Sequence, residues 1–328
     1  MHAMPTILIT GSSGFIGSSL RRRFEEAGWD TRGVGRRATS QSKYYRCDLA
    51  KDLDFELERL LRSADVVVHA AARSSPWGTR RQFFLANVRA TKNLIDACEK
   101  NGRPRLVYVS SSSVYYEPRD QIQITESTPQ AEKPINRYAA SKQLGEKMIR
   151  EYSGGWVILR PRAVYGRGDT VLFPRILKAA KAGRLPLLTR PGPVAIGDLI
   201  SIQNLCEYFL IAANDGSLMG DYNLTDNEPV EIHKFLFGIF DRLGIPHPTK
   251  RLSVQSAHQL AAVIEWVYGW TMPWLEPPIT RFGVHVFAHS KTFDIAKTIA
   301  DLGHPKFTTA QCVDDFVSWI QQENPYGA

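Results

Sequence analysis

The chain has 328 residues, and its 43% hydrophobic and 23% charged residues are ordinary proportions for a globular protein with a large core. Its net charge of +8 lies in scattered basic clusters, which favours anionic small molecules over nucleic acid as the expected partner. No apolar run approaches the roughly 20 residues that cross a bilayer, and no signal peptide precedes the first predicted strand. The four cysteines lie apart, without metal-binding spacing. We therefore expect a cytoplasmic protein that holds no metal.

Short β-branched runs alternate with helical patterns in the first half of the chain, which is typical of a parallel sheet. The predicted strands cover 6–10, 30–35, 66–70, 105–110 and 155–160, and the predicted helices cover 14–27, 87–100 and about 138–151. Beyond Arg160, proline and glycine become frequent. We therefore predict an α/β fold with a doubly wound Rossmann domain over 1–165, to which 194–214 returns, and a smaller, mostly helical substrate-binding domain over 166–328.

A glycine-rich turn joins the first predicted strand to the first predicted helix. Gly11, Gly14 and Gly17 let the backbone turn tightly and let phosphate oxygens approach the free N–H groups at the helix start. A glycine triplet is a weak signal alone, but this one occupies the first strand-to-helix turn of a parallel-sheet pattern, as dinucleotide binding requires. The turn therefore predicts a dinucleotide cofactor.

The end of the second predicted strand indicates which dinucleotide binds. An acidic residue there would bind a ribose 2′-hydroxyl, whereas an arginine would bind a 2′-phosphate. The sequence has Arg36 and Arg37 at this place and no carboxylate, and a guanidinium forms forked, charge-assisted hydrogen bonds with phosphate. The sequence therefore favours NADP(H). NAD(H) is the alternative if the two arginines form only a solvated basic turn.

Tyr138 and Lys142 lie four residues apart, so they share one face of a predicted helix. Reduction of a ketone requires a hydride and a proton that reaches the developing alkoxide. A free phenol has a pKa of about 10, and a neighbouring ammonium lowers that pKa towards the working range. We therefore predict Tyr138 as the acid–base group and Lys142 as the residue that tunes it.

These motifs together resemble the extended short-chain dehydrogenases/reductases, the NAD-dependent epimerase/dehydratase family, along most of the chain. The matching segments are TGSSGFIG at 10–17, DL at 48–49, HAAA at 69–72, NVRATKNL at 87–94, SSSSVYY at 110–116, YAASK at 138–142 and LRPRAVYGRGD at 159–169. The resemblance implies a homodimer, and it selects Ser111 as the third catalytic residue, which orients the carbonyl, with Ser112 and Ser113 as substrate contacts. With the two arginines above included, the expected cofactor-binding residues are Gly11, Gly14, Phe15, Ile16, Gly17, Arg36, Arg37, Asp48, Leu49, Ala70, Ala71, Ala72, Asn87, Tyr138, Lys142, Pro161 and Val164.

The same resemblance bears on the substrate. Nucleotide-sugar members of the family commonly carry asparagine where this chain has Ala163, whereas segments 278–281, 292–297 and 301–305 resemble 3β-hydroxysteroid dehydrogenases and 2-alkyl-3-oxoalkanoate reductases. We therefore predict an NADP(H)-dependent enzyme that interconverts a ketone and a secondary alcohol on a moderately large, apolar small molecule, sterol-like or 3-oxoacid-like. Arg162, a candidate substrate contact, meets either an acidic substrate group or a nearby carboxylate of the protein.

Two other functions remain open. One is a nucleotide-sugar 4-epimerase that uses the same Ser, Tyr and Lys, and the other is a non-catalytic binding protein that senses a nucleotide. The aromatic stretch that holds Trp266, Trp270 and Trp274 also has three interpretations: a lid or pocket wall, packing in a core, and contact with a membrane surface.

Overall fold

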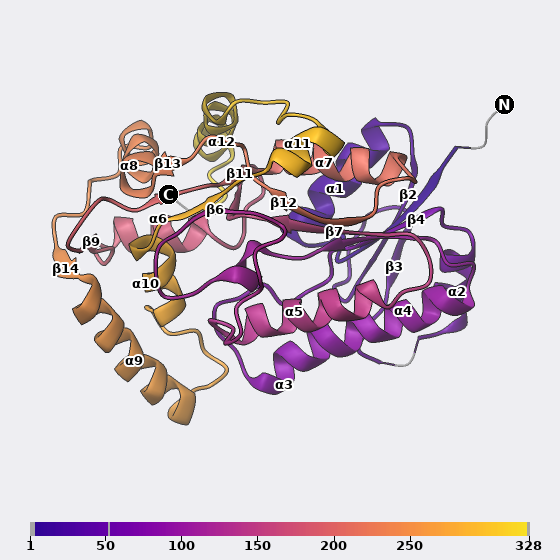
Figure 1. The fold of residues 1–328 in the computed structure, drawn as a ribbon, viewed down its shortest axis with the longest axis horizontal. Helices are drawn as coiled ribbons and strands as arrows, with labels where there is room; N and C mark the ends of the chain where they lie inside the picture. The colour runs from indigo at the N-terminus through magenta and orange to yellow at the C-terminus, as the bar shows by residue number, and fades with distance from the viewer. Residues whose placement is uncertain (1–3, 52, 327–328) are drawn as a thin grey trace.

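The computed structural model describes residues 4–51 and 53–326 (Figure 1). Within these residues, seven parallel strands form a central sheet in the order β12-β7-β5-β4-β1-β2-β3. The strands are β1 (Thr6–Thr10), β2 (Asp30–Gly35), β3 (Tyr44–Arg46), β4 (Val66–His69), β5 (Arg105–Val109), β7 (Trp156–Pro161) and β12 (Gly220–Leu224). The inner strands are buried on both faces, which explains their continuous apolar runs. The predicted doubly wound parallel sheet is confirmed.

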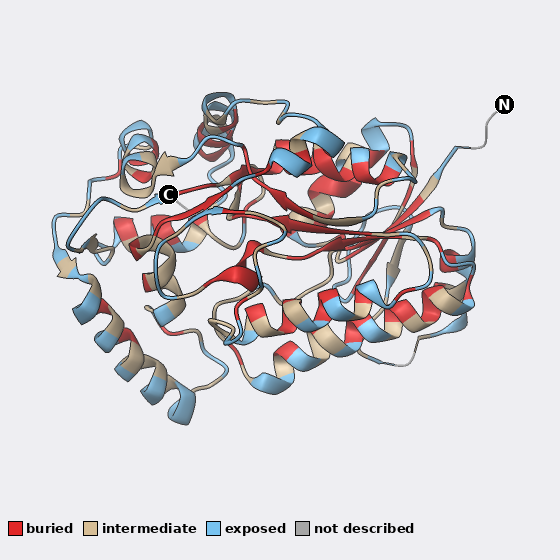
Figure 2. Cartoon of the chain, viewed as in Figure 1, coloured by how far each residue is buried: buried red, intermediate tan, exposed pale blue. Residues whose placement is uncertain are grey.

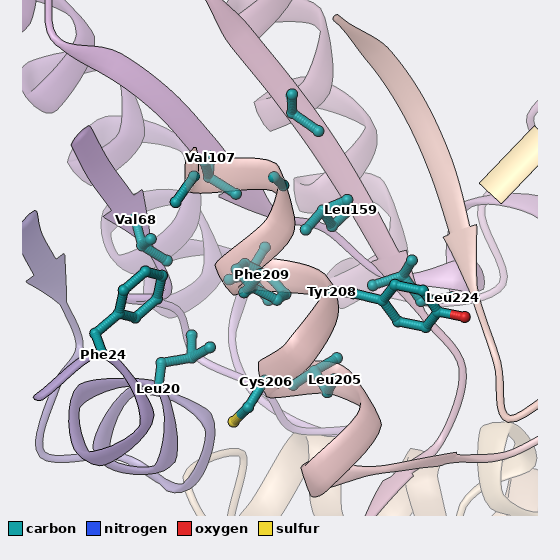
Figure 3. Close-up of a cluster of buried hydrophobic side chains, with 14 of the residues drawn as sticks. Leu20, Phe24, Val68, Val107, Leu159, Leu205, Cys206, Tyr208, Phe209 and Leu224 are labelled. Atoms are coloured by element: carbon teal, nitrogen blue, oxygen red, sulfur yellow. The ribbon is translucent and has the colours of Figure 1, made fainter. Parts of the chain in front are cut away.

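Helices cover both faces of this sheet (Figure 1). One face carries α1 (Phe15–Glu26), α7 (Ile202–Asn214) and α11 (Ala296–Leu302), and the other carries α2 (Phe55–Arg62), α4 (Ala90–Lys100) and α5 (Arg137–Arg150). Along β1, Ile7 and Ile9 belong to the core beneath α1 and α7, while Leu8 belongs to the core on the opposite face. Figure 3 shows the first of these cores, in which Phe24 of α1 and Phe209 of α7 lie over the strands.

The helix predicted over 87–100 begins earlier in the structure. It starts as α3 (Arg80–Phe83), passes through a π-helical turn (Phe84–Arg89) and continues as α4. Thr79 fixes its start, because the side chains of Thr79 and Gln82 each accept a hydrogen bond from the other residue's backbone N–H. The wider π turn contains Asn87, and such turns are frequent at functional sites.

The second half of the chain returns to the sheet with α7 and β12 and otherwise packs beyond the carboxyl ends of its strands (Figure 1). Its helices there are α6 (Phe173–Lys181), α8 (Ile232–Arg242), α9 (Val254–Thr271), α10 (Arg281–Ala288) and α12 (Thr309–Glu323). Short strands form three smaller sheets, two of which pair the second half with β6 or β8 of the first half, while β9 and β14 pair with each other. These strands are β6 (Gln121–Ile124), β8 (Val164–Tyr165), β9 (Leu187–Thr189), β10 (Ile196–Gly197), β11 (Ile200–Ser201), β13 (Val230–Glu231), β14 (Arg251–Ser253) and β15 (Lys291–Phe293). A separate buried core joins α6, α8 and α12.

Helix α9 carries the aromatic stretch, and most of it faces solvent (Figure 2). It buries only Ala257 and Ala261, whereas Trp266 and Trp270 are 72% and 84% exposed, and Trp274 beyond the helix is 69% exposed. Packing of these tryptophans in a core, one of the three interpretations, is therefore wrong. None of the helices within 4–51 and 53–326 combines the length and the apolar character needed to cross a membrane.

Candidate active site

A cavity of about 880 Å³ lies beyond the carboxyl ends of β1, β4, β5 and β7. Its opposite wall comes from α6, α8, α10 and the loop before α10, and none of the residues of α9 lines it. The carboxyl ends of parallel strands are where doubly wound sheets bind ligands, because the strand-to-helix loops gather there. The cavity runs from the glycine-rich turn to an apolar wall that includes Leu236, Phe237, Phe282 and Phe287.

The glycine-rich turn fits a dinucleotide pyrophosphate. Gly11 has φ +69°, and a Cβ atom there would lie 2.7 Å from the Ala71 backbone, while a Cβ at Gly17 would overlap the Gly11 carbonyl. Only glycine therefore allows this close packing of backbone. Gly14 caps α1 without a side-chain hydrogen bond, so the N–H groups of the first turn are left for an anion.

The two arginines predicted to select the cofactor stand at the same end of the cavity. Arg36 and Arg37 follow β2, line the cavity and are exposed. Their backbone is held in place, because Arg46 Nε donates to the Arg36 carbonyl at 3.2 Å and Tyr44 Oη donates to the Arg37 carbonyl at 2.6 Å. Within the described residues neither guanidinium forms an ion pair, so both are available to a phosphate.

Tyr138 lies in the first turn of α5, which begins after Asn136 because the Asn136 side chain accepts a hydrogen bond from Ala139 N at 2.8 Å. Burial raises the pKa of the Tyr138 phenol, and hydrogen bonds to the hydroxyls of Ser74 and Ser111 only partly offset that rise. The expectation that the phenol pKa is lowered is therefore not met, because desolvation outweighs the effect of the neighbouring groups.

Lys142 follows Tyr138 by one turn of α5 and is fully enclosed. Its ammonium donates to the Val109 carbonyl at 2.6 Å and lies 4.7 Å from the centre of the Tyr108 ring. Burial lowers the pKa of Lys142 to about 7, and Glu146 opposes this shift. Two of the three N–H donors of the ammonium are thus directed at β5, one at the Val109 carbonyl and one at Tyr108 Oη, which lies 3.5 Å away. The third donor remains for a ligand in the cavity.

The four consecutive serines after β5 have different surroundings. Ser110 donates to Glu146 at 2.5 Å, and Ser112 shares a hydrogen bond of 2.8 Å with the Tyr116 hydroxyl. Ser111 accepts from Ser113 N at 3.2 Å and lies beside the Tyr138 phenol. Ser113 Oγ is buried and has no hydrogen-bond partner among the described residues. Of the four serines, Ser111 is the one that lowers the pKa of the Tyr138 phenol.

The structure brings nearly all of the predicted site residues to one cavity. Ser111, Ser112, Ser113, Arg162 and every expected cofactor-binding residue except Asn87 line the cavity. Asn87 is enclosed behind it, because its amide accepts from Arg73 N at 2.7 Å and donates to Ser141 Oγ at 2.8 Å. The Asn87 side chain holds the loop after β4 against α5, and its place near the nicotinamide stays a prediction.

Three neighbours of Tyr138 and Lys142 were not found from the sequence. Ser74 reaches the Tyr138 phenol from the loop after β4, Tyr108 lies beside the Lys142 ammonium, and Tyr116 lines the cavity. The position of Ser74 directly after the HAAA segment was the one available signal, because that loop ends a predicted strand. Tyr108 and Tyr116 gave none, since an isolated tyrosine is typical of a core.

The comparisons with known proteins agree with this geometry. Residues 7–225 match the model of the NAD dependent epimerase/dehydratase family. The chain belongs to this family. It is 30% identical over 315 residues to the 2-alkyl-3-oxoalkanoate reductase of Shewanella oneidensis, which covers 90% of this chain and 81% of that relative. It is 28% identical over 311 residues to the 4-hydroxy-2-methyl-3-oxo-4-farnesyl-3,4-dihydroquinoline-1-oxide ketoreductase of Stigmatella aurantiaca, which covers 92% of each chain.

A solved structure has the same fold. The UDP-glucose 4-epimerase of Thermus thermophilus, in complex with NAD, matches this extended short-chain dehydrogenase/reductase with a TM-score of 0.73 at 22% identity, covering 97% of this chain and 99% of the epimerase. At this level of identity the match concerns the fold alone. Family and relatives together make this short-chain dehydrogenase/reductase an NAD(P)-dependent oxidoreductase with a nicotinamide dinucleotide cofactor.

Proposed function

We propose that this enzyme uses NADP(H) to interconvert a ketone and a secondary alcohol on an apolar substrate, with Ser111, Tyr138 and Lys142 as its catalytic residues. One observation carries the proposal. The phenol of Tyr138, flanked by the hydroxyls of Ser74 and Ser111, faces a cavity that runs from the glycine-rich turn to an apolar wall. A hydride carrier and an apolar ketone would therefore meet beside this phenol.

The nicotinamide cofactor, when bound, supplies the hydride. Ser111 Oγ donates a hydrogen bond to the ketone oxygen and so orients the carbonyl, and Tyr138 transfers its phenolic proton to that oxygen as it gains negative charge. The hydride on carbon and the proton on oxygen together give the secondary alcohol, and a proton from solvent restores the phenol. Lys142 would hold a ribose hydroxyl of the cofactor with its third donor, and its charge would stabilise the phenolate.

The preference for NADP(H) is supported by Arg36 and Arg37, which line the dinucleotide end of the cavity without ion-pair partners among the described residues. A ribose 2′-phosphate would give both guanidinium groups a charged partner, whereas a 2′-hydroxyl would offer only a neutral acceptor. Asp48 also lines this end, but it follows β3 rather than β2. The charge at the end of β2 is thus positive, as NADP(H) requires.

The apolar substrate is supported by the far wall and by the relatives. Leu236, Phe237, Phe282 and Phe287 line that wall, and the names of the two relatives describe reductases of ketones that carry alkyl or farnesyl groups. Ala163 argues against a nucleotide sugar, because it offers no amide where epimerases of the family commonly carry asparagine. Its φ of +40° is a conformation that asparagine tolerates better than alanine, so the loop geometry fits the family while the side chain does not.

The test is Tyr138→Phe, assayed by NADPH consumption over a series of apolar ketones, 3-oxo acids and nucleotide sugars. We expect turnover of any substrate to fall by at least about 100-fold, because a general acid is lost, while the Kd for NADPH stays unchanged. Tyr152→Phe is the matched control, since Tyr152 donates to the Pro104 carbonyl away from the cavity. Full turnover in Tyr138→Phe contradicts the assignment, and conversion of a nucleotide sugar without net NADPH consumption would show an epimerase.

A further inference from the structure

Arg162 is a buried cation that lines the cavity and forms no ion pair with the described residues. It follows Pro161 at the end of β7, is only 4% exposed and lines the cavity. Its Nε is buried without a hydrogen-bond partner, and it takes part in no ion pair within residues 4–51 and 53–326. A buried guanidinium without partners is costly, so a ligand that supplies the partner is the simplest account of such a site.

The nearest charged groups do not fill this need. Asp198 is close enough for Arg162 to act on its pKa, but one of its oxygens accepts from Phe293 N at 2.7 Å, and no ion pair with Arg162 forms. Lys291, the second cation beside the Tyr116 ring, donates to the backbone carbonyls of Glu117 and Arg119 and so has its own partners. The guanidinium of Arg162 lies 5.2 Å from the centre of the Tyr116 ring.

The surroundings suit a carboxylate better than a phosphate. Ser113 Oγ, which lines the same cavity, is also buried without a partner, whereas Phe282 and Phe287 on the facing wall are apolar. A guanidinium fork binds both oxygens of a carboxylate. A phosphate monoester would bring a second negative charge that this single guanidinium leaves unmatched.

We propose that Arg162 binds a carboxylate that the substrate carries close to its reacting carbonyl, so that the enzyme prefers 3-oxo acids and 3-hydroxy acids to neutral ketones and alcohols. This inference rests on the proposed function, because it places the carboxylate in the cavity that holds Tyr138. Tyr116 lies between Arg162 and Tyr138. The guanidinium of Arg162 lies over the Tyr116 ring, and the Tyr116 phenol is near enough to Tyr138 to influence its pKa.

The first experiment compares 3-hydroxydecanoate with its methyl ester as substrates for NADP⁺- or NAD⁺-dependent oxidation. The wild type is expected to prefer the acid. Arg162→Met is expected to lower kcat/KM for the acid by about 100-fold, mainly through KM, and to change kcat/KM for the ester by less than about threefold. Arg162→Lys keeps the charge but loses the fork, so its loss on the acid should be intermediate.

The second experiment measures binding without turnover. Protein saturated with NADPH cannot oxidise a 3-hydroxy acid, so calorimetric titration then reports the Kd alone. The acid should bind at least about tenfold more tightly than the ester in the wild type, and this preference should vanish in Arg162→Met. Arg175→Met is the matched control, because Arg175 also lines the cavity but is paired with Glu276 at 2.8 Å. Its preference for the acid should persist.

The outcomes separate this inference from the function on which it rests. Equal losses on acid and ester, an acid preference that survives in Arg162→Met, or no acid preference in the wild type would overturn the carboxylate site and leave the oxidoreductase standing. Arg162-dependent binding of the acid with no turnover of either probe would overturn the proposed reaction alone. The thermal midpoint of Arg162→Met should equal or exceed that of the wild type, because the variant removes an unpaired buried charge.

Discussion

Tyr138 and Lys142 show how burial away from water shifts the pKa of a group that ionises to an anion and of a group that ionises to a cation. Burial raises the pKa of the phenol and lowers the pKa of the ammonium to about 7, because each neutral form is favoured away from water. The hydroxyls of Ser74 and Ser111 oppose the first shift, and Glu146 opposes the second. The phenol is consequently protonated at neutral pH, which suits a residue that donates a proton to a ketone.

The choice of cofactor depends on two side chains. Arg36→Ala combined with Arg37→Ala is expected to raise the Kd for NADPH by roughly 10- to 100-fold, because charge-assisted hydrogen bonds to a 2′-phosphate are lost. The Kd for NADH should change by less than about threefold, since NADH carries no phosphate at that position. Fluorescence titration of each dinucleotide measures both constants.

A second pair of neighbouring arginines provides the control for that experiment. Arg80 and Arg81 are exposed at the start of α3 and do not line the cavity. Their joint replacement by alanine changes the net charge equally and should leave both dinucleotide constants unchanged. An equal weakening of NADPH and NADH by the change at Arg36 and Arg37 would point to NAD(H) instead.

The site residues found from the sequence share one property, which is that a local motif identifies them. Gly11, Arg36 and Lys142 each stand at a fixed place relative to a predicted strand or helix, so their pattern is visible in one segment. Ser74 and Tyr116 reach the cavity from loops whose course depends on the packing of distant segments. Their contacts could not be predicted, because no local spacing encodes them.

At the scale of elements, the contact between α5 and β5 positions Lys142. Gly145 faces β5, and a Cβ atom at this position would overlap Tyr108 Oη. The Tyr108 ring is 1% exposed and also lies beside the Lys142 ammonium, so it has little room to move. Glycine at 145 therefore sets how closely α5 approaches the sheet.

Gly145→Ala is expected to lower the free energy of unfolding by roughly 1–3 kcal/mol, because the added methyl group overfills a packed contact. Gly238→Ala is the matched control in α8, where Gly238 is exposed and an added Cβ would meet nothing within 4 Å. This control should raise the free energy of unfolding by about 0.5–1 kcal/mol, since alanine favours the helix. Urea titration followed by circular dichroism measures both, and equal effects would contradict the close approach of α5 to β5.

The elements differed in how well the sequence revealed them. β1 and β2 have the bounds predicted, because β1 ends at the glycine-rich turn and β2 ends at Gly35, before Arg36 and Arg37. β12, with the mixed sequence GDYNL, joins the sheet only through its pairing with β7, which no local pattern encodes. The tryptophans of α9 were the hardest to place, because their exposure depends on which face of the helix packs against the rest of the protein. α9 packs on α10 with little more than Ala257 and Ala261.

For the whole molecule, a buried ionic network joins the two halves of the chain. Glu146 on α5 accepts from Arg160 on β7 at 2.7 Å, and Arg160 also contacts Asp221 at the start of β12 at 2.5 Å. Burial alone would raise the pKa of Glu146, but hydrogen bonds and charge from Arg160 lower it overall. β12 is thus held in the sheet by strand pairing with β7 and linked to α5 by the ion pairs of Arg160.

The dependence of folding on pH provides a test of how completely this interior excludes water. His69 at the end of β4 is 1% exposed, and its ring nitrogens are hydrogen-bonded to Thr10 at 2.7 Å and Thr91 at 2.9 Å. Burial, assisted by the charge of Lys142, lowers the pKa of His69 from 6.5 to about 3. Between these two values the unfolded chain binds a proton that the folded protein does not.

Stability from His69 is therefore fully present above pH 6.5 and is lost as the pH falls towards 3. We expect this one group to contribute a slope of about 1.4 kcal/mol per pH unit to the free energy of unfolding across that window. Burial raises the pKa values of Asp198 and Asp226 to about 6, so these two groups make the folded protein less stable as the pH rises. Both groups are present in the wild type and in His69→Gln, so their effect cancels when the two proteins are compared. Urea titrations of both proteins at several pH values between about 4.5 and 6.5 should show the smaller dependence in His69→Gln. Parallel curves for the two proteins would mean that water or a proton reaches His69 in the folded state.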